Sequence, residues 1–201
     1  MNFINFIIEY QVLKKIPRAG WLSCSVPLNE VKTVALHTLD TVIISMVISD
    51  LFKSNGHAVD CEKVLRIALI HDLPETRIGD VALPNKKYFN GKENLKKFEE
   101  NVISDILVEC DAPREYMELW KGKGEGIEGK IVDVSDLFSI LFEQVELRNR
   151  GFKGDELDDI CKKVMDELSG LCKDYEFLME IIGEFKEKFK FKNSTKIKNY
   201  L

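Results

Sequence analysis

The spacing of apolar residues along the chain predicts α-helices and no β-strand. Apolar side chains recur at intervals of three and four residues, which places them on one face of a helix. Helix-ending residues such as Asn55-Gly56 and Gly151 follow several of these stretches. The predicted helices span residues 3–15, 30–53, 61–71, 92–110, 113–121, 127–149 and 155–190. The pattern therefore indicates an all-α bundle of six to eight helices.

Two segments interrupt this pattern and one ends it. Residues 17–29 carry turn signals, and residues 73–91 predict a broken helix followed by an irregular loop, because they contain Pro74, Gly79, Pro84 and Gly91. Loops of this kind often carry functional residues. We expect residues 1–185 to form a single domain and the Lys-rich residues 186–201 to be a frayed C-terminal tail.

Composition narrows the class of protein. A hydrophobic fraction of 45% and a charged fraction of 31% over 201 residues are typical of a globular protein with a sizeable core. The net charge of −5 offers no basic surplus, so we expect no nucleic-acid partner. The longest apolar stretch, residues 41–52, is interrupted by Asp50 and is too short to span a bilayer, so we expect no membrane partner.

Cysteine usage and the N-terminus bear on location. The five cysteines are scattered and form no C-x-x-C motif, which argues against a disulfide framework or a zinc finger. The N-terminus lacks the basic region and small-residue cleavage site of a signal peptide. We therefore expect a reduced protein with a cytoplasmic location.

The dipeptide His71-Asp72 is the first candidate for metal chemistry. It ends the apolar run 64–70 and offers one nitrogen and one oxygen ligand. Pro74 indicates that the chain turns there, because proline disfavours a helical conformation in the residue before it. His37 lies within an apolar helix and is the best partner, whereas His57 follows a glycine in a polar turn where we expect solvent exposure.

A fourth ligand is predicted on a later helix. Asp133 and Asp136 are three residues apart, and so on one face of a strongly apolar helix. Such helices do not bury carboxylates without a counterion or a metal. Spacing alone leaves open which aspartate is the ligand, and also whether both face solvent.

Together these residues resemble the HD-domain metal-dependent phosphohydrolases, whose pattern is H…HD…D. The closer resemblance is to the small HD-domain 5′-deoxynucleotidases, over about residues 8–150. The matching motifs are Pro17-Arg18-x-Gly20-Trp21, His71-Asp72-x-x-Glu75, Gly79-Asp80, Pro84-x-x-x-Tyr88-Phe89 and Ser135-Asp136-Leu137. The family fold is an all-α HD-domain helical bundle, which agrees with the predicted helices.

The resemblance implies a role for each candidate residue. It selects Asp136 over Asp133 and implies one divalent ion (Co²⁺, Mn²⁺, Fe²⁺, Ni²⁺, Zn²⁺ or Mg²⁺) held by His37, His71, Asp72 and Asp136. The catalytic residues implied are Glu75, which would orient or deprotonate the attacking water, and Asp80. The substrate-binding residues implied are Arg18, as a phosphate clamp, and Trp21.

The implied activity is hydrolysis of a (deoxy)nucleoside 5′-monophosphate to nucleoside and phosphate by a homodimer. Two features depart from the family pattern. Leu36 stands where relatives commonly carry an acidic residue before the first histidine, and Ala19-Gly20 separate the arginine from the tryptophan. The first bears on the hydrogen bonding of His37, and the second on sugar recognition.

Three other functions fit the same fold. A dinuclear phosphodiesterase needs more histidines than the three present. A nucleotide triphosphohydrolase usually needs a larger chain and more basic groups around the site. A non-catalytic nucleotide-binding regulatory module would be supported by a missing ligand, and all four ligands and Glu75 are present. These remain the alternatives to a nucleotidase.

Overall fold

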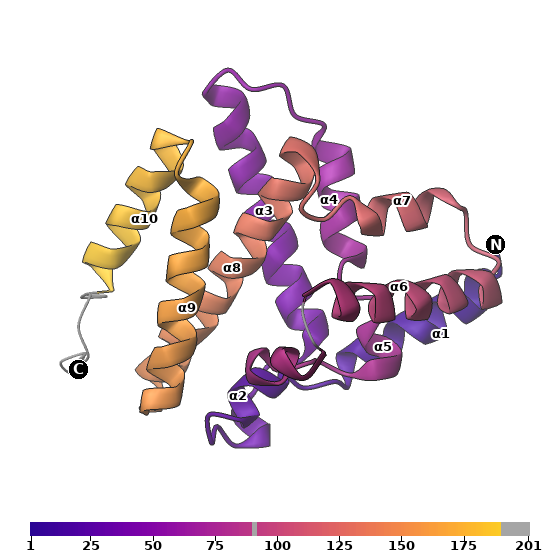
Figure 1. Ribbon diagram of the computed structural model, residues 1–201, viewed down its shortest axis with the longest axis horizontal. Coiled ribbons are helices and arrows are strands. Elements are labelled where there is room, and N and C mark those ends of the chain that lie inside the picture. The colour runs from indigo at the N-terminus through magenta and orange to yellow at the C-terminus, as the bar shows by residue number, and fades with distance from the viewer. Residues whose placement is uncertain (90–91, 190–201) are drawn as a thin grey trace.

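The computed structural model describes residues 1–89 and 92–189, and these residues form a bundle of helices (Figure 1). The α-helices are α1 (Phe3–Gln11), α2 (Ala19–Leu22), α3 (Val34–Ser54), α4 (Cys61–Ile70), α5 (Glu75–Ile78), α6 (Lys92–Glu109), α7 (Glu115–Lys121), α8 (Gly126–Asn149), α9 (Asp155–Cys172) and α10 (Glu176–Lys188). Short 3-10 helices are η1 (Val12–Lys14), η2 (Leu28–Glu30) and η3 (Leu83–Phe89). Within the described ranges no strand occurs, and one isolated bridge pairs Pro17 with Thr33. The prediction of an all-α fold is confirmed.

Helix α3 lies at the centre and packs most extensively against α8 and then against α4 (Figure 1). Helix α9 covers α8, and α10 packs on α9. Fully buried side chains from three of these helices, including Phe52, Ile67 and Leu141, belong to one apolar cluster. Burying each such side chain contributes about 1.5–3 kcal/mol relative to leaving it in water. The relative placement of α3, α4 and α8 is therefore held by the core of the molecule.

The predicted helices agree with the structure except where single turns or a tight break occur. Helices α4 and α8 begin and end within one residue of the prediction, and the Asp60 side chain caps α4 by accepting from the Lys63 backbone N–H at 3.0 Å. The single-turn helices α2 and α5 are too short to produce a periodic pattern. The helical region predicted over residues 155–190 consists of two helices, α9 and α10, and the Tyr175 ring between them packs against Phe52 with ring centroids 4.8 Å apart.

Helix α10 runs to Lys188, so its last residues lie past residue 185, the expected end of the domain. The division into a domain of residues 1–185 and a C-terminal tail stays a prediction. Residues 190–201 of the predicted tail lie outside the described part of the chain.

Helix α3 would pass as a membrane span by length and composition. The sequence-based estimate counted only residues 41–52, whereas the whole helix is 21 residues long. In the structure its inner face carries buried His37, Thr41 and Ser45 and packs against two other helices. These contacts are those of a core helix in a bundle.

The short helix α5 is held from both sides by one arginine. The Arg77 guanidinium donates to Glu9 on α1, with Nε at 2.9 Å, and to Glu109 on α6, with Nη2 at 2.7 Å. Thr76 also donates to Glu9 at 2.7 Å. This clamp positions α5, which begins with the candidate catalytic residue Glu75.

Candidate active site and metal centre

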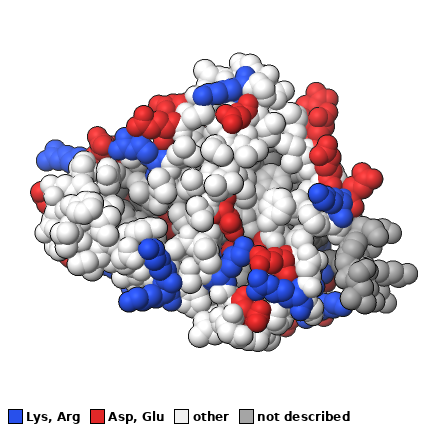
Figure 2. Space-filling model, turned by 180° about the vertical axis from the view of Figure 1, so that it is seen from behind, with Lys and Arg blue, Asp and Glu red and all other residues white. Residues whose placement is uncertain are grey.

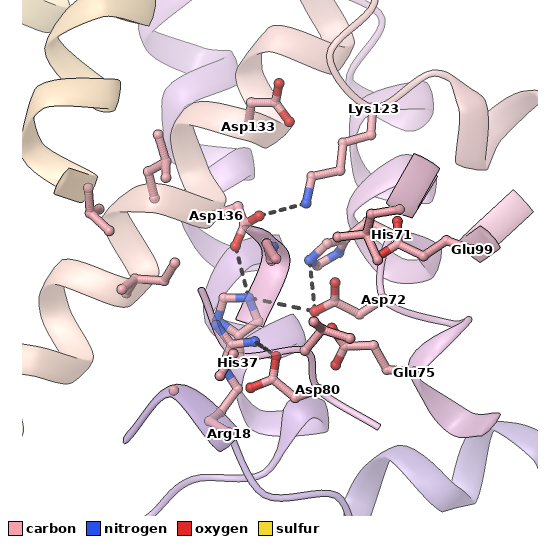
Figure 3. Close-up of a pocket in the computed structure, with 18 of the residues that line it drawn as sticks. Arg18, His37, His71, Asp72, Glu75, Asp80, Glu99, Lys123, Asp133 and Asp136 are labelled. Carbon is pink, nitrogen blue, oxygen red and sulfur yellow. Dashed lines mark hydrogen bonds and ion pairs between the residues drawn. The ribbon is translucent and has the colours of Figure 1, made fainter. Parts of the chain in front are cut away.

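Three predicted ligands from two helices meet at one point. His37 lies in α3, His71 is the C-cap of α4, and Asp72 follows at the turn. The ligand atoms of all three lie within 4.8 Å of one another, with His71 Nε2 at 3.1 Å and His37 Nε2 at 3.6 Å from Asp72 Oδ2 (Figure 3). The end of α4 thus turns the dipeptide toward the histidine of the neighbouring helix.

Asp136 on α8 completes the set. Its Oδ1 atom lies 2.9 Å from His37 Nε2, and its Oδ2 atom accepts from Lys123 Nζ at 2.6 Å. Asp133, one turn earlier on the same helix, lines the same cavity, but Figure 3 shows its carboxylate farther from the histidines. The structure therefore brings Asp136, and not Asp133, against the histidines.

Both histidine rings are oriented by bonds at Nδ1. His71 Nδ1 lies 2.7 Å from the Ala68 carbonyl oxygen, which can only accept, so the proton of the neutral ring belongs on Nδ1. His37 Nδ1 lies 2.7 Å from the Ser139 hydroxyl, which itself donates to the Asp136 carbonyl and so accepts from the ring. In both neutral rings the Nε2 lone pair faces the other ligands, which is the arrangement of metal-binding histidines.

The donor set fits a divalent metal ion. Among the described residues, His71 Nε2 and Asp72 Oδ2 are buried and have no hydrogen-bond partner. Buried polar atoms without partners are costly, and a shared ion removes that cost. Nitrogen and oxygen ligands lie about 2.0–2.2 Å from such an ion, so neighbouring ligand atoms are about 3 Å apart. The measured separations of 2.9, 3.1 and 3.6 Å agree with this geometry.

Electrostatics keeps both ligand carboxylates ionised. Without a metal, burial by itself raises the pKa of Asp72, but charge and hydrogen-bond donation from the adjacent rings of His71 and His37 outweigh burial and hold that pKa far below its usual value. Burial likewise opposes ionisation of Asp136, and Lys123 together with His37 lowers its pKa well below normal. An ionised carboxylate is the form that binds a metal.

In contrast to the two ligand aspartates, Glu75 lies in an environment that opposes ionisation of its carboxyl group. It is the first residue of α5 and lines the cavity beside Asp72, and its Oε2 atom is buried without a hydrogen-bond partner among the described residues. Burial, followed by the negative charges of Asp72 and Asp80, raises the pKa of Glu75 well above its ordinary value. A carboxyl group with a raised pKa close to a metal centre is suited to proton transfer.

Asp80 and Arg18 are in contact in the lining of the cavity. Gly79 adopts a φ of 72°, a conformation that glycine adopts without strain, and places Asp80 beside the start of α2. Asp80 accepts from the Ala19 backbone N–H at 2.6 Å and from Arg18 Nη1 at 3.4 Å. Trp21 lies in the next turn, is 3% exposed, and also lines the cavity.

These residues line one cavity of about 770 Å³, within the range of small-molecule sites. Basic residues that line it include Lys86 and Lys87. Part of its lining is apolar and comes from α8 and α9, which the resemblance did not cover in full: Leu137, Ile140, Ile160, Val164 and Leu171. The cavity thus joins a charged end to an apolar chamber.

Sequence reasoning missed several residues that shape the site. Lys123 lies in the Gly-rich break at residues 121–126 ahead of α8, and no sequence motif assigned it a role in the site. Gly129 lets this break approach α8, because a Cβ atom there would lie 2.0 Å from the Gly122 carbonyl oxygen. Ser139 and Glu143 carried no local signal, since their importance depends on contacts with residues more than 100 positions away.

The structure also places Leu36 and His57, two positions that the sequence analysis discussed. Leu36 is 48% exposed on the outer side of α3, so the departure from the family pattern lies away from His37, whose ring is held by Ser139. His57 is not a free polar residue in a turn, because its ring packs against Phe52 at 5.3 Å and against Tyr175 at 5.6 Å. It lies in this aromatic cluster and not among the metal-ligand candidates.

Comparison with protein families matches residues 10–173 to the HD domain. The chain belongs to the HD-domain family. The 5′-deoxynucleotidase HDDC2 of Dictyostelium discoideum is 29% identical over 124 residues, which cover 60% of this chain but less than two thirds, 63%, of that protein. The 5′-deoxynucleotidase HDDC2 of Homo sapiens is 28% identical over 164 residues, covering 79% of this chain and 74% of that protein.

A solved structure supports the same assignment. A conserved hypothetical protein from Pyrococcus furiosus has a TM-score of 0.77 and 32% sequence identity, and the match covers 92% of this chain and 99% of that one. The resemblance inferred from the H…HD…D pattern is therefore confirmed. Members of the HD-domain family depend on metal, and this chain has a His-His-Asp group that could hold one.

Proposed function

We propose that this HD-domain protein is a metal-dependent 5′-nucleotidase that hydrolyses (deoxy)nucleoside 5′-monophosphates to nucleoside and phosphate. The observation that carries the proposal is the meeting of two histidines, two aspartates, Glu75 and Arg18 at one end of a single cavity. Relatives named 5′-deoxynucleotidases support the substrate class. The apolar chamber between α8 and α9 offers room for a nucleoside.

The ligand set supports one bound ion, held by His37, His71, Asp72 and Asp136. When bound, a divalent ion would lower the pKa of a coordinated water and polarise a phosphate oxygen. Its identity within the set Co²⁺, Mn²⁺, Fe²⁺, Ni²⁺, Zn²⁺ and Mg²⁺ depends on geometry and availability. The five cysteines are all free thiols, which suits the cytoplasmic location that we also propose.

The chain's own residues account for the proton and charge transfers. In hydrolysis a water oxygen bonds to phosphorus, the bond from phosphorus to the 5′ oxygen breaks, and the leaving oxygen takes up a proton. Glu75 accepts the proton of the attacking water, since its environment favours the protonated carboxyl group. Arg18 stays charged and binds phosphate oxygens, and Asp80 holds its guanidinium.

A phosphate-release panel tests this function. Purified protein is stripped of metal, reloaded separately with each of the six ions, and given deoxyribo- and ribonucleoside 5′-monophosphates. We expect inorganic phosphate to be released from at least one of them in a metal-dependent manner. The absence of phosphate release from every nucleotide under every metal would overturn the proposal. In a parallel assay with nucleoside triphosphates, release of triphosphate would favour the triphosphohydrolase.

We also propose that the chain forms a homodimer through α3. The outer face of this helix exposes about half of each of four apolar side chains at alternating three- and four-residue spacing: Leu36, Leu39, Ile43 and Met46. This spacing forms the seam of paired helices, and a two-fold axis would pair the stripe with itself. Helix α1 also exposes apolar residues, and the rear view shows wide areas without charged side chains (Figure 2).

Ile43→Glu should convert the dimer into a monomer. Ile43 lies at the middle of the stripe, so a two-fold axis would bring two glutamates together and bury both charges. Light scattering after size-exclusion chromatography measures the mass of each variant. Asp105→Lys, on the exposed side of α6, is the control and should elute like the wild type. A wild-type protein that is monomeric at all concentrations would refute the dimer.

A further inference from the structure

Glu143 is a buried carboxylate to which no step of the proposed reaction gives a role. It lies in α8, is 2% exposed, and its Oε2 atom accepts from the Trp21 indole N–H at 2.7 Å. The same Oε2 atom lies 4.0 Å from Arg18 Nε. Glu143 therefore contacts both substrate-facing residues of the segment that precedes α3.

Arg18 is placed between two carboxylates on opposite sides. Its Nη1 atom lies 3.4 Å from Asp80 Oδ1, and its Nε edge faces Glu143. Within the described residues neither Arg18 Nε nor Glu143 Oε1 has a hydrogen-bond partner. Charges buried to this extent are stable only when paired, so the position of the guanidinium depends on these two contacts.

We propose that Glu143 is a positioning residue that fixes Arg18 and Trp21 relative to the metal ligand Asp136. Asp136 and Glu143 are seven residues apart on α8, so two helical turns, about 10 Å, separate them on one face of a rigid element. The phosphate clamp and the metal centre are thereby built on the same helix. This role rests on the proposed function, since it concerns the phosphate of that substrate.

Glu143→Gln tests whether the negative charge of Glu143, and not its shape, is what positions Arg18. Glutamine keeps the oxygen that accepts from Trp21 and fills the same volume, but it loses the negative charge beside Arg18. We expect the KM for the preferred monophosphate to rise about 5–50-fold, with a smaller change in kcat, because a poorly held Arg18 binds phosphate more weakly. Inhibition by inorganic phosphate should weaken by the same factor.

A double-mutant cycle with Arg18→Ala decides between positioning and a general structural role. If Glu143 acts through Arg18, then Glu143→Gln should change KM less than twofold in the Arg18→Ala background. An equal rise in KM in both backgrounds, or no rise in the wild-type background, would overturn the proposal. Glu146→Gln is the control on the same helix, because Glu146 pairs with Lys32 outside the main cavity and should leave KM unchanged.

Two further measurements keep the test decisive. Calorimetric titration of metal-loaded protein with inorganic phosphate gives a Kd for each variant of the double-mutant cycle without turnover. The positioning role of Glu143 is therefore tested independently of the nucleotidase activity. If circular dichroism shows that Glu143→Gln is unfolded, Glu143→Asp retains the charge at a shorter reach. We expect it to weaken phosphate binding in the wild-type background only, and an equal effect in both backgrounds would refute the role.

Discussion

Replacing Asp72 with alanine should abolish both metal binding and phosphate release. Asp72 Oδ2 lies within 3.6 Å of the Nε2 atoms of both candidate histidine ligands, so its loss removes the oxygen ligand common to both. In the wild type a metal at 100 times its Kd stabilises the folded state by about 2.7 kcal/mol, which raises Tm by about 5–10 °C. Elemental analysis and thermal melts with and without metal measure both effects.

The matched control for this prediction is Asp133→Asn. Asp133 lines the same cavity on α8, but it is Asp136 whose Oδ1 atom lies 2.9 Å from His37 Nε2, while the Asp133 carboxylate lies farther from the histidines (Figure 3). We expect this variant to keep its bound metal and its metal-dependent rise in Tm, whereas Asp136→Asn should lose both. Metal retention in Asp72→Ala, or equal loss in Asp133→Asn and Asp136→Asn, would show that the ligand set has been assigned wrongly.

Replacing Glu75 with glutamine should reduce kcat about 10²–10⁴-fold while the metal stays bound, the usual contribution of a general base. An amide has the shape of the carboxyl group but cannot accept a proton from water. Since Glu75 must be ionised to act as a base, the wild-type rate should rise with pH through its raised pKa, and this rise should be absent from the variant. Rates of phosphate release from pH 5 to 9 measure both effects.

The same substitution should stabilise the metal-free protein at alkaline pH. A carboxyl group whose pKa is raised on folding destabilises the folded state as pH rises, because the unpartnered charge must be buried. Glu75→Gln removes that charge, so at pH 8 it should melt above the wild type. Glu100→Gln is the control, because Glu100 is a half-buried α6 residue paired with Lys121, and it should change neither rate nor stability appreciably. A Glu75→Gln variant that retains more than a tenth of wild-type kcat would contradict the role of Glu75 as a general base.

The helical scaffold was largely predictable because local signals specify it. The apolar period placed α4 and, together with Gly151, α8, each to within about a residue. The single turn α2, which carries Trp21, was missed, since four residues cannot show a period, whereas α5, which begins at Glu75, lies in the segment 73–91 where a broken helix was predicted. At the break between α9 and α10, Tyr175 packs against Phe52, a partner more than 100 positions away that no local pattern reveals.

The candidate site was predictable only in part. Residue types and motif resemblance pointed to two histidines, two carboxylates and an arginine, and the structure brings all of these to one cavity. Lys123, Ser139 and Glu143 were not foreseen, because each acts through a partner on another segment. Spacing along α8 placed Asp133 and Asp136 on one face but could not separate them.

By itself the sequence determined that the protein is an all-α member of the HD-domain family with enough histidines for one metal centre. Only the tertiary structure decided that Asp136 contacts His37, that Leu36 points outward, and that Glu143 holds Arg18 and Trp21. The physical reason is that helical periodicity specifies which residues share a face of one helix. The rotation and depth at which α3, α4 and α8 meet depend on packing between residues far apart in the chain.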